Sequence, residues 1–474
     1  MNRTVAFVSL AGGLALLALV LAVPAATPTQ PPRPSVGVKP PPPPPPPAPP
    51  SGSLALDGRL SHPAIGTGRS EVFLSVGVRG VEIPGAERAP VNAALVIDRS
   101  GSMAGEKLAY AKEAALQFVS QLRESDRVAI VHYGSDVRVF RSAHATAENK
   151  SRMSSFIRRI QEDGGTNIGD GLETGRAQLL AAKEQFKVNR IILLSDGQPT
   201  EGLTAPDALF GVASRIRRNG IAVSAIGIGT DFNEDLMQGI AERGSGAYGY
   251  LRDGSRLATI FQKDLDQAGK TVARNVELSF ELPEGVELAE VLGYSHRRAG
   301  RTVRVPLTDF SAGQVERVVA RLSVTGAELG KSVQVARVHL SYSDVLADRA
   351  AEVSAALAAE VTDREEEIAS RQDKDVAVFA ARARAAVNVQ KAADALARGD
   401  FAGANRTLRQ NAAIFGAAAA VASPEAVAED RVAQKKLEAS FSAAPSAAPE
   451  QVQHEVKAAK SKALRDFGRM GSTY

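Results

Sequence analysis

Five side chains that carry hard oxygen atoms lie in three loops, each bordering a predicted strand or helix, in the central part of the 474-residue chain. Hard cations such as Mg²⁺ prefer oxygen ligands in octahedral geometry and usually retain some water. Two carboxylates would balance a divalent charge and leave a coordination position for a carboxylate of another molecule. This set therefore indicates a binding site for an acidic partner rather than a catalytic centre. Its members are Asp98, Ser100, Ser102, Thr166 and Asp196.

The local sequence around these positions is distinctive. The pattern Asp-x-Ser-x-Ser follows the apolar run Ala93–Ile97, and Thr166 lies in a Gly-Gly-Thr-Asn stretch. Asp196 follows the apolar run Ile191–Leu194 in a Ser-Asp-Gly stretch. In this order and context, the pattern resembles the metal-ion-dependent adhesion site of von Willebrand factor type A domains. The likeness covers roughly residues 90–265.

The resemblance implies a site for Mg²⁺ or Mn²⁺ formed by Asp98, Ser100, Ser102, Thr166 and Asp196, in which Asp196 often acts through water. A plainer alternative for the first motif is a strand end, a turn and a helix cap supplied by Ser102. The matching contexts of Thr166 and Asp196 favour the metal site. A helix beginning near Met103 would also favour an anion next to the metal.

Other chemistries find little support in the sequence. The glycine-rich stretch 164–169 lacks the Gly-Lys-Ser/Thr ending of a phosphate-binding loop. The six histidines are dispersed without metal-ligand spacing, and His132, which follows a buried run, is expected to be a core residue. No nucleophile stands with a base and an orienting partner, so we expect no enzyme. The helical basic clusters Arg158–Arg159 and Arg215–Arg218 are expected to be solvated, or else to help dock an acidic partner.

Composition excludes further classes of protein. With 57 basic and 53 acidic residues the net charge is only +4, which argues against nucleic-acid binding through a basic face. The complete absence of cysteine excludes disulfides, thiolate metal sites, thiol nucleophiles and a lipid anchor on cysteine. A hydrophobic content of 44% is ordinary for globular domains, so a sizeable core is available.

The N-terminus indicates export. Arg3 precedes the mostly apolar run Val5–Val23, and small residues around Val23–Ala25 offer a cleavage site. As a helix this run would also span roughly 28 Å, close to the thickness of a bilayer. Residues 1–25 are therefore a signal peptide or a retained anchor, which would be the protein's one attachment to a membrane. Residues 26–52 form a proline-rich linker, expected as extended polyproline II.

Residues 91–268 alternate short buried strands with amphipathic helices. Val128–Val131, Ile191–Leu194 and Ile221–Ile228 are nearly continuous apolar runs, as expected for strands buried on both faces. This alternation predicts an α/β fold with a doubly wound, mostly parallel Rossmann-like sheet. Ligands of such sheets bind at the carboxyl ends of strands, where Asp98 and Asp196 fall.

Two flanking regions complete the predicted organisation. Residues 269–345 alternate in strand period and predict an antiparallel β-module, which residues 53–90, with the pattern Val72–Val78, are expected to join. Residues 346–474 are alanine-rich and predict a helical region without strands, partly flexible around Ser440–Pro449.

The sequence thus predicts an exported protein, located in the periplasm or cell envelope or secreted. It would bind an acidic side chain of a protein partner through Mg²⁺ or Mn²⁺. The alternative is a metal-independent scaffold of the cell envelope. The partner's identity and the oligomeric state stay open.

Overall fold

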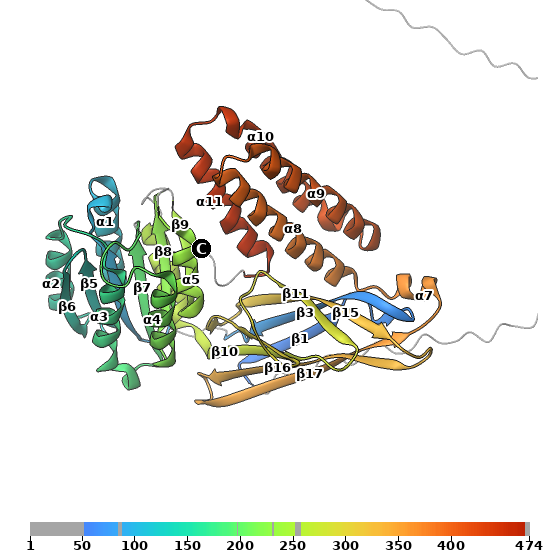
Figure 1. Ribbon diagram of the computed structural model, residues 1–474. Coiled ribbons are helices and arrows are strands. Elements are labelled where there is room, and N and C mark those ends of the chain that lie inside the picture. The colour runs from blue at the N-terminus through green and yellow to red at the C-terminus, as the bar shows by residue number, and fades with distance from the viewer. Residues whose placement is uncertain (1–51, 84–87, 197, 230–231, 252–256, 470–474) are drawn as a thin grey trace, which may run out of the picture. The chain divides into compact units, whose positions relative to one another are not determined.

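The computed structural model describes residues 52–83, 88–196, 198–229, 232–251 and 257–469 (Figure 1). The expected signal or anchor segment and nearly all of the proline-rich linker lie outside these residues. Among the described residues, no helix is both long enough and apolar enough to cross a bilayer. Residues 50–474 form one compact unit, built from an α/β domain, a β-module and a helical region.

The α/β domain is organised around a six-stranded sheet in the order β6-β5-β4-β7-β8-β9. Every neighbouring pair is parallel except β5 and β6, which are antiparallel. All residues of β4, β7 and β8 are buried, which explains why these strands are continuous apolar runs. The strands are β4 (Val91–Asp98), β5 (Arg127–Tyr133), β6 (Val137–His144), β7 (Val188–Ser195), β8 (Ala222–Ile228) and β9 (Ser245–Leu251).

Helices cover both faces of this sheet (Figure 1). One apolar cluster joins the sheet to α1 (Glu106–Gln121), α2 (Ala147–Arg158) and α6 (Leu257–Gly269). The opposite cluster joins it to α3 (Ile168–Leu180), α4 (Pro206–Arg218) and α5 (Glu234–Arg243). The chain leaves β4 toward β5 on one side and returns to β7 on the other, so a crevice opens at the carboxyl ends of β4 and β7. Two short 3₁₀ helices, η1 (Gly101–Met103) and η2 (Lys183–Gln185), lie in the connections.

The β-module consists of two sheets, in the orders β1-β3-β15-β11 and β12-β13-β10-β16-β17-β2, with β14 paired to β10. Strand β3 precedes the α/β domain and β15 follows it, yet the two pair from Gly68 with Gly326 to Arg79 with Val315. The α/β domain is thus inserted into the module. The strands are β1 (Leu54–Leu60), β2 (Ala64–Ile65), β3 (Gly68–Gly80), β10 (Thr271–Glu281), β11 (Val286–Leu292), β12 (Arg297–Ala299), β13 (Thr302–Pro306), β14 (Phe310–Ser311), β15 (Val315–Gly326), β16 (Ser332–Asp344) and β17 (Arg349–Val361).

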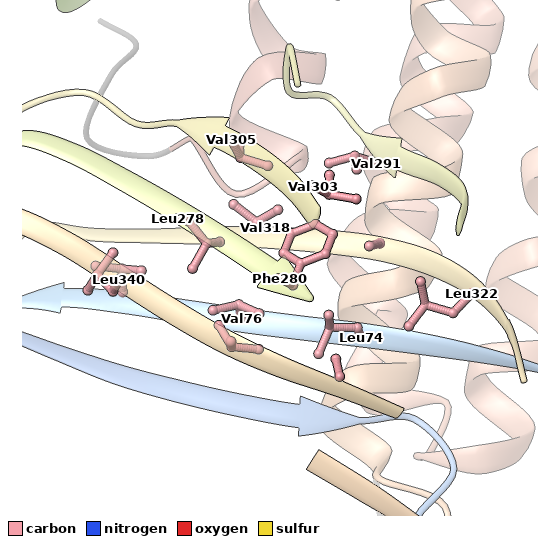
Figure 2. Close-up of a cluster of buried hydrophobic side chains, with 14 of the residues drawn as sticks. Leu74, Val76, Leu278, Phe280, Val291, Val303, Val305, Val318, Leu322 and Leu340 are labelled. Atoms are coloured by element: carbon pink, nitrogen blue, oxygen red, sulfur yellow. The ribbon is translucent and has the colours of Figure 1, made fainter. Parts of the chain in front are cut away.

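Figure 2 shows the core of this module, in which side chains from strands far apart in the chain meet. Leu74 and Val76 of β3 lie in the same cluster as Phe280 of β10 and Leu340 of β16. Phe280 is fully buried. Apolar side chains on one face of each sheet line this core, whereas Phe73 of β3 and Val319 of β15, on the opposite face, belong to the apolar cluster of the helical region.

Strand β17 corrects the expectation that residues 346–474 are helical throughout. It pairs with β16 from Asp344 with Arg349 to Ser332 with Glu360, apart from one shift in register. Alanine has a low strand propensity, and the alanine-rich composition of Arg349–Val361 suggested helix. The inward positions Val353 and Leu357 pack on the module core, so burial and pairing with β16 outweigh propensity.

The remainder of the C-terminal region is helical. Gly399, with φ at +79°, permits the turn between α8 and α9, and Asp400 caps α9 by accepting a hydrogen bond from Gly403 N at 2.8 Å. The stretch Ser440–Pro449, expected to be a flexible joint, contains the end of α10 and η5. The elements are α7 (Glu365–Ser370), α8 (Lys374–Ala397), α9 (Phe401–Val421), η4 (Glu425–Val427), α10 (Ala428–Ala443), η5 (Ala444–Ser446) and α11 (Pro449–Asp466).

Candidate metal centre

The two aspartates lie at the ends of neighbouring parallel strands. Asp98 is the last residue of β4, and Asp196 directly follows Ser195, the last residue of β7. Ile97 is the register partner of Leu194, so both strands end at the same level. Asp98 and Asp196 are 0% and 1% exposed, so two carboxylates are buried at one point of the crevice. A buried carboxylate is costly unless its charge is compensated.

Hydrogen bonds join four of the five proposed ligands in one chain. Ser100 N donates to Asp98 Oδ1 at 2.9 Å, and the hydroxyl oxygens of Ser100 and Ser102 lie 3.1 Å apart. Ser102 Oγ then donates to Asp196 Oδ1 at 2.8 Å. The strand ends and the η1 turn thus gather two carboxylates and two hydroxyls.

Thr166, the fifth residue, lies on the loop that precedes α3. Its N–H donates to Thr200 Oγ1 at 2.8 Å, and its carbonyl accepts from Thr200 N at 3.0 Å. Gly101 N donates to Gly164 O at 3.2 Å, which ties this loop to the Ser100–Ser102 turn. Among the described residues, no hydrogen bond links the Thr166 side chain to the other four. The loop therefore borders the site without closing it.

Two residues that the sequence did not single out hold Asp98. Ser195 Oγ donates to Asp98 Oδ2 at 2.6 Å, and Tyr133 OH donates to the same oxygen at 3.3 Å. Burial raises the pKa of Asp98 to about 6, and the negative charge of Asp196 also raises it. The hydrogen bonds from Ser100 and Ser195 act in the opposite direction and lower it. Burial beside Asp98 also raises the pKa of Tyr133 well above its ordinary value. Both residues are strand-end residues, and only their tertiary position reveals their role.

The donor set fits a hard divalent cation. In the part of the chain that the structure describes, Asp98 receives hydrogen bonds from neutral donors and forms no ion pair. The second buried carboxylate, Asp196, is connected to Asp98 by the hydrogen bonds of Ser100 and Ser102. Carboxylate and hydroxyl oxygens are the ligand types that Mg²⁺ and Mn²⁺ take. Among the described residues, no group of three or more histidine or acidic side chains is arranged to hold a metal ion, so this site would combine two carboxylates with hydroxyl oxygens.

Arg99, which stands between Asp98 and Ser100 in the first motif, is buried and joins two loops around the site. Its side chain pairs with Asp136 on the β5–β6 loop, and its Nη1 lies 3.0 Å from Asp163 Oδ2 on the loop that carries Thr166. Its backbone repeats both links, with N donating to Tyr133 O and O accepting from Asp163 N, each at 2.8 Å. The sequence shows only a charged residue here, which would ordinarily be expected on the surface.

Comparison with known proteins identifies the α/β domain. Residues 92–263 match the family model described as the von Willebrand factor type A domain. The chain contains a von Willebrand factor type A (VWA) domain. Its bounds agree with the six-stranded sheet and its helices, and the resemblance expected from the metal-site motif is confirmed.

Curated relatives match this VWA domain and its surroundings. Uncharacterized protein YfbK of Escherichia coli K12 is 29% identical over 242 residues, 50% of this chain and 42% of its own. Uncharacterized protein sll0103 of Synechocystis is 27% identical over 268 residues, 54% of this chain and 62% of its own. Human inter-alpha-trypsin inhibitor heavy chain H3 is 28% identical over 206 residues, 42% of this chain and 23% of its own. The chain thus spans less than two thirds of the length of each.

Two solved structures share the fold beyond the VWA domain. The von Willebrand factor type A protein from Catenulispora acidiphila has a TM-score of 0.62 at 19% identity, over 82% of this chain and 89% of that one. The ArnB paralog VWA2 from Sulfolobus acidocaldarius has a TM-score of 0.54 at 18% identity, over 87% of this chain and 98% of that one. These likenesses confirm the fold class, a doubly wound α/β domain with flanking modules.

Lys107 adds a cation to the VWA site. It is the second residue of α1, and its Nζ lies 2.5 Å from Asp196 Oδ2. Its side chain is 27% exposed, whereas that of Asp196 is fully buried. The sequence gives one weak signal for this contact, the position of Lys107 five residues after Ser102, in the first turn of the following helix.

The last helix of the chain also contacts the VWA domain near this edge of the sheet. Lys457 Nζ of α11 donates to Phe232 O at 2.9 Å, and it lies 3.9 Å from the centre of the Phe232 ring. Phe232 belongs to the connection between β8 and α5, at the carboxyl end of the sheet. The ring of His454 also lies within hydrogen-bond distance of Tyr250 OH, at 3.1 Å.

Proposed function

We propose that this protein is an exported binding protein whose VWA domain takes an acidic side chain of a partner protein at a divalent metal site. VWA domains often mediate protein interactions and adhesion, and binding rather than catalysis suits a set of proposed metal ligands made of carboxylates and hydroxyls. The observation that carries the proposal is the hydrogen-bonded chain from Asp98 through Ser100 and Ser102 to Asp196. It gathers hard oxygens at the one crevice of the sheet where ligands of doubly wound folds bind.

The residues have distinct roles in this proposal. Asp98, Ser100 and Ser102 would supply the main coordination of Mg²⁺ or Mn²⁺, because they stand together on one strand end and turn. Asp196 would contribute negative charge to the site and bind the metal through a water molecule, since its two oxygens already accept hydrogen bonds from Ser102 and Lys107. Thr166 would complete the set from its own loop. When bound, the cation would supply an electrophilic position for a carboxylate oxygen.

The proposed location rests on the N-terminus. Arg3 and the apolar run Val5–Val23 support translocation of the rest of the chain, with the body of the protein outside the cytoplasm. Cell fractionation of the full chain, with N-terminal sequencing of the product, distinguishes a cleaved signal from a retained anchor. A full-length product in the cytoplasm would contradict export.

The metal site is tested by calorimetric titration of Mg²⁺ and Mn²⁺ into residues 50–474, the compact unit of the chain. We expect saturable binding that Asp98→Ala abolishes, with the circular dichroism spectrum retained. A partner search should then recover a protein with Mn²⁺ present and lose it on chelation. Equal binding in wild type and Asp98→Ala would contradict the metal site, and capture that survives chelation would favour a metal-independent scaffold.

A further inference from the structure

Lys107 occupies a built position beside Asp196 rather than a solvated surface position. Both oxygens of the fully buried Asp196 carboxylate are engaged, Oδ1 by the Ser102 hydroxyl at 2.8 Å and Oδ2 by the Lys107 ammonium at 2.5 Å. Any metal ion that interacts with the Asp196 carboxylate must therefore share that carboxylate with Lys107. The positive charge of the ammonium thus acts directly on the proposed metal site.

The shape of the neighbouring loop fits this lysine. Gly229, at the end of β8, has φ at +83°, a conformation that favours glycine. A Cβ at Gly229 would lie 2.9 Å from Lys107 Cε and 3.2 Å from Nζ. The absence of a side chain there leaves the space in which the end of Lys107 reaches Asp196. The side chain of Lys107 thus extends from α1 past Gly229, the residue that follows β8.

Charge counting shows what the lysine does. Asp98 and Asp196 together carry two negative charges, which a divalent cation would cancel to zero. Lys107 adds one positive charge in direct contact with Asp196, whereas Arg99 pairs with Asp136 and Asp163 on the neighbouring loops. Beside a bound divalent cation, this additional positive charge would favour the approach of a carboxylate from a ligand. Before a ligand arrives, the ammonium repels the incoming metal and competes for Asp196.

We propose that Lys107 is a resident cation of the site, which weakens divalent metal binding and strengthens binding of a carboxylate to the loaded protein. This inference rests on the proposed metal-dependent function and names the residue that sets its ligand preference. It predicts effects of opposite sign on the two affinities. A purely structural ion pair would instead change folding stability and move both affinities together, or neither.

The test uses residues 50–474 with Lys107→Met, which keeps an unbranched side chain of similar shape, one atom shorter, and removes its charge. Mn²⁺ affinity is measured by calorimetry. Acetate binding to the Mn²⁺-loaded protein is measured by water proton relaxation, which reports displacement of water. The matched control is Lys112→Met, because Lys112 lies on the same helix but donates to a backbone carbonyl, Ile160 O, at 2.9 Å. Lys107→Gln repeats the measurement if Lys107→Met is poorly folded.

We expect the Lys107 variant to bind Mn²⁺ at least about tenfold more tightly and acetate about tenfold more weakly, with the control unchanged. Wild-type Mn²⁺ binding with unaltered affinities in both Lys107 variants would overturn the role of Lys107 alone. Weaker Mn²⁺ binding in folded Lys107 variants would overturn it too. If neither wild type nor variant binds Mn²⁺, the proposed function itself fails, and this inference with it.

Discussion

Arg99 and Asp163 join the two loops on which the metal site depends, across 3.0 Å from Nη1 to Oδ2. Arg99 stands between Asp98 and Ser100, and Asp163 lies three residues before Thr166. The guanidinium is 3% exposed at its side chain, whereas the Asp163 side chain is 63% exposed. The buried guanidinium of Arg99 therefore fixes the Thr166 loop through the exposed carboxylate of Asp163.

We expect Arg99→Met to weaken metal binding about tenfold or more while leaving the sheet folded. Without the guanidinium, the Thr166 loop loses its link through Asp163 and the β5–β6 loop loses its link through Asp136, but both carboxylates regain solvent. The cost to the free energy of unfolding should therefore stay at about 1–2 kcal/mol. Calorimetric Mn²⁺ titration and urea unfolding measure the two effects. Arg138→Met is the control, since Arg138 pairs with Asp136 at the exposed surface. An unchanged Mn²⁺ affinity would show that the backbone links suffice.

Asp98→Asn should remove the stabilisation that Mg²⁺ confers. A ligand that binds only the folded state adds RT ln(1 + [L]/Kd), about 2.7 kcal/mol at a hundredfold excess over Kd. Asparagine keeps the size of the side chain and can still accept from Ser195 and Tyr133, so the fold should persist. Thermal unfolding with Mg²⁺ and with chelator compares the two conditions. A magnesium-dependent rise in Tm that persists in the variant would place the cation elsewhere.

Glu234 gives the contact between α5 and α11 a pH dependence. Burial raises its pKa from 4.5 to about 7, opposed by Lys460 and Lys457 of α11, and Tyr248 OH donates to its carboxylate at 3.3 Å. Below pH 4.5 the carboxyl group is protonated whether the protein is folded or not, and its contribution to stability is complete. As pH rises through 7, folding comes to require a buried charge and stability falls, by at most about 3 kcal/mol.

Glu234→Gln should abolish this loss. The stability of the variant relative to wild type is expected to increase from pH 4.5 to pH 7 and to level off above it. Urea unfolding at half-unit intervals of pH measures the difference. Asp235→Asn is the control, because the Asp235 side chain is 84% exposed. A constant difference between Glu234→Gln and wild type across this range would contradict the assignment.

Phe280→Ala should destabilise the β-module by about 3–5 kcal/mol, because it removes a fully buried ring from a core of interlocking strands (Figure 2). The ring lies in the module core, apart from the apolar clusters of the VWA sheet. Mn²⁺ affinity of the folded protein should therefore stay at its wild-type value. Urea unfolding and Mn²⁺ titration at low temperature check both statements. A loss of metal affinity in the folded variant would reveal coupling between module and site.

The sequence predicts what depends on local pattern. Buried runs such as Ala93–Ile97 and Ile191–Leu194 have no polar face, so they indicate a parallel sheet whose carboxyl edge carries Asp98 and Asp196. The fold class followed from this pattern and is confirmed. The five proposed ligands could be chosen because their order and local context resemble the metal site of VWA domains. That they bind metal stays a prediction.

What the sequence did not reveal depends on tertiary pairing. Arg99 and Lys107 are charged residues, which a pattern assigns to solvent, and only their carboxylate partners on distant loops account for their positions. Strand β17 was missed for a different reason: its alanines carry little strand signal, and β16 supplies the order. Local propensity is a weak guide where packing decides.

The insertion of the VWA domain into the β-module fixes an order of events during synthesis. Leu74 of β3 cannot pair with Ala320 of β15, its register partner, until the whole VWA domain between them has been synthesised. The inserted domain has all its own strands by then, and its two ends are joined by the hydrogen bond from Ala89 N to Gly269 O at 2.8 Å. The part that carries the proposed metal site can therefore mature first. Until β15 is synthesised, β3 has no strand paired along that side. In a chain whose synthesis stalls at this stage, this unpaired strand edge is where we expect aggregation to begin.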